Sequence, residues 1–387
     1  MNIDTKLQEY VVNIRRELHE CPELSLNEFK TKEKIVRELE KMGLVPFFSE
    51  KYPTAVYAEI KGEKSGKTVA LRADTDALPI EEETDVAFKS KNTGVMHACG
   101  HDAHTAMLLG CAKYLTENRD KIKGKVKLIF EPAEEIGAAG RGIVAEGLLD
   151  DADTVFAIHI DPNIEAGKAN IAPGIRMAGA GGFSAKIKGM GGHASNPSGG
   201  IDAIVASGAV IMGLQSIVSR EISPLDSAVV SIGTINGGTK SNIICEEVEM
   251  KGSLRYYNNA VKELLPNSVK RIISDIASAY RCTAEVSASC MLPPCVNDRR
   301  CADIALKALE KVAGEGALNE LPCFTGSDDF AFYLEKVPGV YAFLGVMPEG
   351  ETVYPIHNKL FKLNEKGLGM GAMLYAEYAM TYMEENI

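Results

Sequence analysis

Residues 97–104 read His-Ala-Cys-Gly-His-Asp-Ala-His, which places three imidazoles, a thiol and a carboxylate within a short segment. Imidazole and thiolate are the preferred protein ligands of zinc-like divalent cations. The whole chain has only seven histidines, so this concentration is a strong bias. The alternative is a polar helix start, because a helix beginning near Gly100 would place His97, His101 and His104 on one side. The segment alone leaves both interpretations open.

A pair of carboxylates, Glu134 and Glu135, follows an apolar segment and Pro132. Adjacent side chains on irregular backbone can point in different directions, so one could bind a cation while the other stays free. A free carboxylate beside a bound cation is suited to general-base catalysis. The alternative is a charged surface pair, but the position directly after a buried-looking strand favours a site.

Two isolated histidines extend the set of possible ligands. His159 ends an apolar run, and His357 lies in a loop before the last predicted helix. The combined donors are Cys99, His101, Glu135, His159 and His357. Five S, N and O donors exceed the three or four that one zinc ion needs, and a shared thiolate could bridge two ions. We therefore expect a site for two divalent ions.

Short apolar runs alternate with helical patterns, which predicts an α/β domain with a central mixed sheet flanked by helices. Its strands are expected at 54–60, 68–74, 125–131, 154–160 and 340–346, and its helices at 4–20, 27–42, 101–118, 299–313 and 364–383. Three of the strands run into Asp74 and Asp76, into Glu131 and the glutamate pair, and into His159. Because open α/β sheets bind ligands outside the carboxyl ends of their strands, one convergent site is expected.

A Gly-rich stretch at 173–182 precedes a strand–helix–strand–strand–helix–strand order, which is typical of a ferredoxin-like βαββαβ unit. The expected strands are 183–189, 227–235, 246–255 and 282–290, and the expected helices are 201–219 and 266–280. We interpret residues 180–293 as a domain inserted into a larger domain made of 1–179 and 294–387.

The composition of the 387 residues, 45% apolar and 25% charged, is that of an ordinary globular protein. A net charge of −11 argues against nucleic acid and anionic membrane as partners. The amphipathic, charged start does not resemble a signal peptide, and no apolar run is expected to be long enough to span a bilayer. Nine irregularly spaced cysteines favour buried thiols in a reducing cytoplasm over a disulfide framework.

Six motifs together resemble peptidase family M20, the aminoacylase/carboxypeptidase-type metallohydrolases. They are RADTDALP (72–79), MHACGHDAH (96–104), EPAEE (131–135), AIHIDP (157–162), GMGGHAS (189–195) and GSDDFAFY (326–333). The similarity covers nearly the whole chain and is strongest to the amidohydrolase branch of hippurate hydrolases, N-acyl-L-amino acid amidohydrolases and auxin-conjugate hydrolases. It implies a zinc-exopeptidase-like fold, a homodimer formed through 180–293 as a lid or dimerisation domain, and cleavage of the amide bond of N-acyl amino acids.

The resemblance also implies a role for each ligand. Cys99 would bridge two divalent ions, with His101 and His159 completing one site and Glu135 and His357 the other. The ions would be Zn²⁺ or Mn²⁺, with Co²⁺ or Ni²⁺ as alternatives.

The resemblance further makes Glu134 the general base and acid. Asp76 would orient a ligand, whereas Asp74 falls where other branches carry a histidine ligand and is not assigned to metal. Asp328 stands where the family usually has Glu, which puts the local packing in question.

Three residues of the inserted domain match substrate-handling positions of the family. His193 would stabilise the oxyanion in the active site of the partner subunit, and Asn242 and Arg255 would hold the substrate carboxylate. A guanidinium suits that task because it binds carboxylates bidentately. The alternative is that Asn242 is a turn residue and Arg255 a surface charge.

Several other functions stay open on the sequence. The enzyme could deacetylate N-acetyldiaminopimelate or a related intermediate, or remove residues from small peptides. A thiol hydrolase with Cys99 as nucleophile and His101 as base would leave the other three donors unused. A non-catalytic homologue would typically lack the base, but Glu134 is present.

Overall fold

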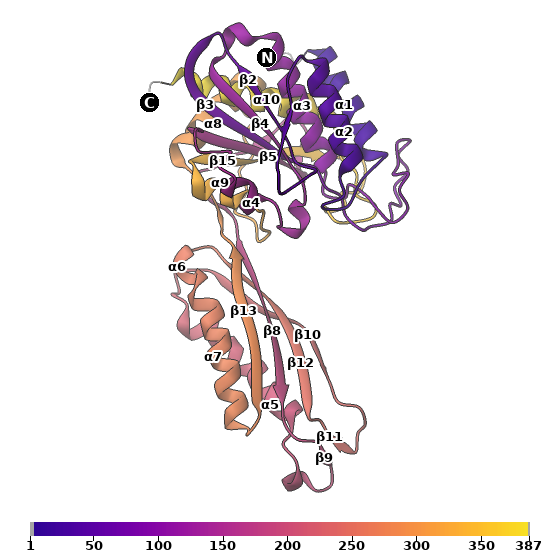
Figure 1. Cartoon of the computed structure of the whole chain (residues 1–387), viewed down its shortest axis with the longest axis vertical. Coiled ribbons are helices and arrows are strands. Elements are labelled where there is room, and N and C mark those ends of the chain that lie inside the picture. Colours follow the sequence, from indigo (N-terminus) through magenta and orange to yellow (C-terminus); the bar gives the residue numbers. More distant parts are fainter. Residues whose placement is uncertain (1–3, 386–387) are drawn as a thin grey trace. The chain divides into compact units, whose positions relative to one another are not determined.

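The computed structural model describes residues 4–385, which fold as two compact units (Figure 1). Unit 1 contains the described residues up to Arg176, Val296–Pro322 and the described residues from Asp328 on, and unit 2 contains Met177–Cys295 and Cys323–Ser327. The segment Cys323–Ser327 lies with unit 2 because Phe324 bridges to Met177 and its carbonyl accepts a hydrogen bond from the hydroxyl of Tyr257. No sequence pattern indicated this short return.

A mixed sheet forms the centre of unit 1, with the strand order β1-β2-β4-β3-β5-β15-β6. The strands are β1 (Phe47–Phe48), β2 (Val56–Lys61), β3 (Lys64–Asp74), β4 (Lys123–Glu131), β5 (Thr154–Glu165), β6 (Ala169–Asn170) and β15 (Gly339–Met347). Strands β4, β3, β5 and β15 run parallel, and antiparallel pairings occur at both edges. The expected central mixed sheet is therefore confirmed.

Helices cover both faces of this sheet. The first face packs in one core with α1 (Thr5–His19), α2 (Phe29–Lys41), α3 (His101–Glu117), α8 (Arg299–Ala313) and α10 (Leu368–Glu384). The short helices α4 (Gly140–Ala145) and α9 (Ala331–Lys336) belong to the second face. Val340 and Ala342 point into the first core, so the intervening Tyr341 points to the second face, where its ring lies 5.4 Å from that of Phe330.

Unit 2 is an antiparallel sheet of strand order β10-β12-β8-β13 with two long helices. Its main elements are β8 (Gly179–Lys188), α5 (Ala203–Ser216), β10 (Ala228–Gly237), β12 (Glu247–Tyr256), α7 (Leu264–Ala279) and β13 (Thr283–Leu292). This chain order with this strand order is the ferredoxin-like arrangement, and α5, α7 and the sheet share a core of their own. The shorter elements of unit 2 are β9 (Gly192–His193), β11 (Ile243–Ile244) and α6 (Asn259–Lys262), whereas most residues of β7 (Gly174–Met177) and β14 (Cys295–Asn297) belong to unit 1.

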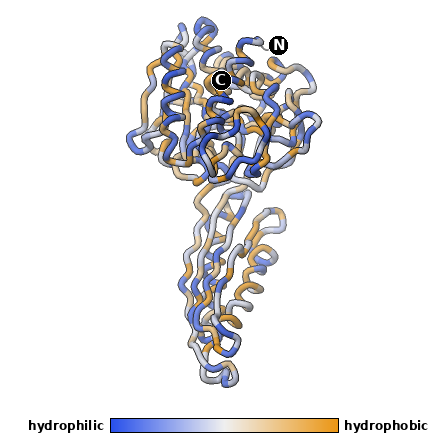
Figure 2. Tube along the Cα trace, turned by 90° about the vertical axis from the view of Figure 1, so that its right-hand side faces the viewer, coloured by the Kyte–Doolittle hydropathy of each residue, from blue (hydrophilic) through white to orange (hydrophobic). Residues whose placement is uncertain are grey.

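The helical stretch Ala203–Glu221 corrects one expectation. By length and composition it could cross a membrane, with a mean hydropathy of 1.4, so the expectation that no apolar run is long enough was wrong (Figure 2). In the structure, Ala206, Val210 and Leu214 of this stretch are buried in the core of unit 2. All nine cysteines of the chain are free thiols.

Candidate metal and catalytic site

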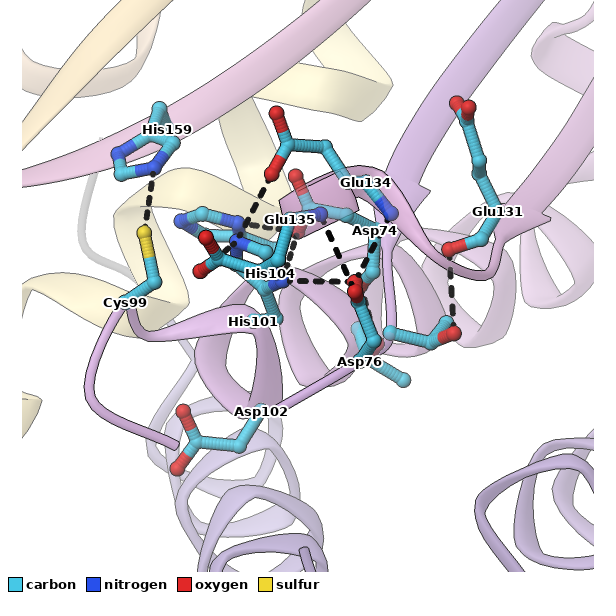
Figure 3. Close-up of polar contacts among 12 residues, drawn as sticks. Asp74, Asp76, Cys99, His101, Asp102, His104, Glu131, Glu134, Glu135 and His159 are labelled. Atoms are coloured by element: carbon cyan, nitrogen blue, oxygen red, sulfur yellow. Dashed lines mark hydrogen bonds and ion pairs between the residues drawn. The ribbon is translucent and has the colours of Figure 1, made fainter. Parts of the chain in front are cut away.

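The five predicted donors lie together in unit 1 (Figure 3 labels four of them). They come from the residues before α3, the first position of α3, the turn after β4, strand β5 and the loop after β15: Cys99, His101, Glu135, His159 and His357. The position of His159 differs from the expectation, because β5 does not end there but continues to Glu165.

The donors form two groups that share one thiol. Cys99, His101 and His159 make the first group, and Cys99, Glu135 and His357 make the second; within each, the ligand atoms lie within 4.8 Å of one another. The Sγ of Cys99 lies 3.4 Å from Nε2 of His159, and Nε2 of His357 lies 3.5 Å from Oε1 of Glu135. One sulfur shared by two sets of donors is an arrangement that could hold a bridged pair of cations.

Two buried donor atoms of this cluster have no hydrogen-bond partner among the described residues. They are Nε2 of His101 and Oε1 of Glu135, which lie 3.8 Å apart. Leaving a buried polar atom without a partner costs free energy, and such atoms in a native site need an explanation. Both would be satisfied by a cation, and their types fit a zinc-like ion.

The opposite ring nitrogens of the two buried histidines are already occupied. Nδ1 of His101 lies 3.2 Å from Oδ1 of Asp76, and Nδ1 of His159 donates to the carbonyl of Ile160 at 2.7 Å. Such contacts fix the ring orientation and leave Nε2 facing the other donors, as histidines do in most metal sites. Asp76 therefore lies where the resemblance predicts an orienting residue.

Gly100 shapes the link between Cys99 and His101. Its φ of +85° lies in the left-handed region, and a Cβ at this position would lie 2.7 Å from Cγ1 of Ile160. Glycine alone meets both conditions without strain.

Gly100→Ala is expected to weaken binding of divalent ions by about tenfold or more, because the added methyl group would displace the predicted donors Cys99 and His101 on either side. The measurement is isothermal titration of the metal-free protein with Zn²⁺. Gly94→Ala, at another left-handed glycine with open space around its Cβ, is the matched control. Equal affinities for the two variants would contradict this explanation.

A strained turn positions Glu134 and Glu135. Ala133 has φ 59° and ψ 33°, which costs a residue with a Cβ about 1–2 kcal/mol. The short helical turn Glu134–Ile136 follows, and its first two backbone N–H groups donate to Asp76 at 3.2 and 3.1 Å (Figure 3). The turn therefore places the two carboxylates next to the donor cluster.

The carboxylate of Glu134 belongs to neither of the groups that share Cys99. Its Oε2 lies 3.9 Å from Nε2 of His101, and the carboxylates of Asp328 and Asp329 approach it on another side. Burial raises the pKa of Glu134 well above its usual value, and the negative charges of Asp328 and Asp329 raise it further. A carboxyl group with a raised pKa can both accept and return a proton.

Asp74 is held by other side chains and is not a free ligand. It accepts a hydrogen bond from Nδ1 of His104 at 2.6 Å and one from Arg72 at 2.7 Å. The remaining nitrogen of His104 accepts the backbone N–H of Ile160 at 2.9 Å. Asp74, His101 and His104 are close enough to hold a cation, but both ring nitrogens of His104 are already used.

Arg72 is a fully buried cation below the site, at 1% exposure. It also contacts Glu131 at 2.7 Å and Asp329 at 3.1 Å. Asp328 lies 3.4 Å from Arg72 and accepts the hydroxyl of Tyr341 at 2.5 Å, so the shorter side chain at this position keeps well-defined partners.

Arg72→Met should lower the free energy of unfolding by about 3–5 kcal/mol at pH 7, because it leaves several buried carboxylates without their cation. Burial raises the pKa of Glu131 and of Asp329 in the folded protein. Groups whose folded pKa exceeds the unfolded value of about 4 lose stabilising free energy as the pH rises. The charge of Arg72 lowers both pKa values, so its removal raises them further and protonation at a lower pH relieves part of the cost. The loss caused by Arg72→Met should therefore be smaller at pH 5.5, measured by urea unfolding. An equal loss of unfolding free energy at pH 7 and pH 5.5 would contradict this prediction.

The three remaining predicted residues lie in unit 2. His193 is exposed on β9. The backbone N–H of the next residue, Ala194, donates to the carbonyl of Asn242 at 3.1 Å, so His193 and Asn242 lie on neighbouring stretches of backbone. Arg255 lies on β12, half-buried, and donates to the carbonyl of Leu254 at 2.9 Å. Among the described residues, none of the three belongs to the donor groups of unit 1.

Sequence reasoning missed the segment from Arg15 to Glu28. Arg15 and His19 are buried and contact Asp102, the neighbour of His101. The hydroxyl of Ser25 donates to Asp76 at 2.6 Å. Nothing in the residue types signalled these contacts, because polar residues in and after an amphipathic helix are usually solvent-exposed.

Comparison with known proteins gives a consistent result. The sequence model of the protein family described as "Peptidase family M20/M25/M40" matches residues 70–381. The N-acetylcysteine deacetylase of Bacillus subtilis (strain 168) is 39% identical over 98% of this chain and 99% of its own length. The IAA-amino acid hydrolase ILR1-like 2 of Arabidopsis thaliana is 39% identical over 99% of this chain and 89% of its own length.

Comparison with solved structures agrees with the match to this family. The crystal structure of the Bacillus subtilis YXEP protein, a dinuclear metal-binding peptidase from the M20 family, has a TM-score of 0.87 to this chain. It is 35% identical, and the match covers 98% of this chain and 99% of the other.

Proposed function

The chain belongs to peptidase family M20/M25/M40 and is an amidohydrolase of N-acyl amino acids, and we propose that it works with two divalent ions bound in unit 1. The proposed ligands are Cys99, His101, Glu135, His159 and His357. The observation that carries the proposal is the sharing of Cys99 by two groups of donors, together with the unpartnered Nε2 of His101 and Oε1 of Glu135. The donor set suits Zn²⁺ or Mn²⁺.

When bound, such ions polarise an amide carbonyl and lower the pKa of water. Glu134 takes a proton from the attacking water at its carboxylate, which lies beside His101 without belonging to either proposed ligand set. The same carboxyl group then gives the proton to the leaving nitrogen, which releases the amino acid. Asp76 holds the His101 ring and the Glu134 backbone in the orientation that this transfer needs.

Unit 2 is proposed to supply substrate contacts and the subunit interface. His193 would stabilise the oxyanion in the active site of the partner subunit, and Asn242 and Arg255 would bind the substrate carboxylate. The apolar side chains of Val205 and Met212 on α5 are 53% and 72% exposed, which supports a homodimer formed through this unit. Nine free thiols support a reducing, cytoplasmic environment.

Glu134→Gln should bind metal and substrate like the wild type but lose about 10²–10⁴-fold in kcat, because an amide cannot accept the proton. Metal content is measured by elemental analysis and turnover by release of the free amino acid. Glu310→Gln, an exposed glutamate of α8, is the control. Substantial activity in Glu134→Gln would contradict the role of the base.

Removal of metal with a chelator should abolish hydrolysis of N-acetyl and N-benzoyl amino acids, and Zn²⁺ or Mn²⁺ should restore it. Substrates whose carboxylate is blocked as an amide should have a raised KM, because the proposed partner of Arg255 is then uncharged. Free dipeptides in the same assay test the exopeptidase alternative. Full activity in the metal-free protein would instead favour a thiol hydrolase with Cys99 as nucleophile.

A further inference from the structure

Glu28 is a fully buried carboxylate at the start of α2 and belongs to none of the donor groups of the site. It occupies the N-cap position, yet its side chain makes no capping hydrogen bond to the helix. Its Oε1 accepts the backbone N–H groups of Ala133 and Leu26, each at 2.9 Å, and its Oε2 accepts the hydroxyl of Thr54 at 2.8 Å. The carboxylate therefore binds a turn that lies more than a hundred residues away in the sequence.

The two N–H groups on Oε1 belong to residues with unusual backbone conformations. Ala133 has a φ of 59° and Leu26 a φ of 65°, and both carry a Cβ. Such residues persist in the left-handed region only where the surrounding structure holds them. One oxygen atom of Glu28 thus holds two strained positions at once.

Asp76 binds the two N–H groups that follow Ala133. Its carboxylate accepts the backbone N–H of Glu134 and of Glu135, and the hydroxyl of Ser25 donates to its Oδ2 at 2.6 Å. Three consecutive N–H groups, those of residues 133–135, are therefore bound by two carboxylates. One N-terminal segment supports both carboxylates: it contains Glu28, and its Ser25, three residues earlier, donates to Asp76.

We propose that Glu28 is a positioning residue for the reaction centre: it fixes the left-handed turn at Ala133, which directs Glu134 and Glu135 to their separate tasks. This inference rests on the proposed function for the roles of those two glutamates. Position 28 needs a side chain of this length with one oxygen that accepts both strained N–H groups and a second polar atom that pairs with the hydroxyl of Thr54. A role in packing alone would need only the volume of the side chain.

The test compares substitutions that keep volume with those that keep hydrogen bonding. Glu28→Met keeps the length but has no strong acceptor, so kcat should fall about ten- to hundredfold while KM changes less than about threefold. The affinity of the metal-free protein for Zn²⁺ should fall about tenfold, because the second proposed ligand set contains Glu135. Glu28→Gln keeps one oxygen for both N–H groups and can donate to Thr54, so it should stay within about threefold of the wild type.

Glu38→Met is the matched control, because Glu38 is a buried carboxylate of α2 at 3% exposure whose partners are Tyr10, Lys34 and Lys41. It should lower stability while leaving kcat and the Zn²⁺ affinity of the folded protein unchanged. A second variant, Glu28→Asp, keeps the buried charge but shortens its reach, and should lower kcat and Zn²⁺ affinity even if Glu28→Met does not fold.

The backbone part of the proposal has its own test. Ala133→Gly should partly restore kcat and Zn²⁺ affinity in the Glu28→Asp background, because glycine adopts the left-handed conformation without a Cβ penalty. The same change in the wild type should have a smaller effect, so the two substitutions are non-additive. Additive effects would overturn the link between Glu28 and the turn.

The proposal is overturned if folded Glu28→Asp matches the wild type within about threefold in both kcat and Zn²⁺ affinity, or if Glu28→Gln is as damaging as Glu28→Asp. The Zn²⁺ titration needs no turnover. If the wild type hydrolyses no N-acyl amino acid, the proposed function fails, whereas the affinities still decide the role of Glu28.

Discussion

The geometry of the site depends on the hydrogen bonds and close contacts that the carboxylate of Asp76 makes. It faces the ring of His101, accepts two successive backbone N–H groups of the Glu134 turn and receives the hydroxyl of Ser25. One side chain just after β3 therefore links the first turn of α3, the turn after β4 and the N-terminal segment. Burial makes each of these bonds costly to leave unmade, so the elements hold one another in a single arrangement.

The second constraint is electrostatic. A sheet whose parallel strands end in carboxylates accumulates negative charge, and the fully buried guanidinium of Arg72 offsets it from below. Its fixed charge and forked donors suit it to several carboxylates at once. The anionic ends of the strands can then coexist with the unpartnered Nε2 of His101 and Oε1 of Glu135.

The sequence predicted much of this structure because local patterns and chemistry pointed the same way. Strand β3 and helix α3 were expected from their apolar runs, and the donors could be recognised because histidine and cysteine are rare in the chain. The contribution of Glu28 could not be predicted, because a glutamate at the start of a helix is ordinarily a surface charge near the positive end of the helix dipole. The inclusion of Cys323–Ser327 in unit 2 depends on long-range contacts, which no periodicity reveals.

Helix α3 carries His101 and His104 three residues apart on one side, and the two imidazoles have the same chemistry. The difference between them comes from strand β5, whose Ile160 amide points at Nε2 of His104 and occupies its lone pair. The main chain of a neighbouring strand thereby leaves Nε2 of His101 without a hydrogen-bond partner and gives Nε2 of His104 one. The number of ring nitrogens that are available to a cation therefore depends on where peptide groups point as much as on how many histidines the helix presents.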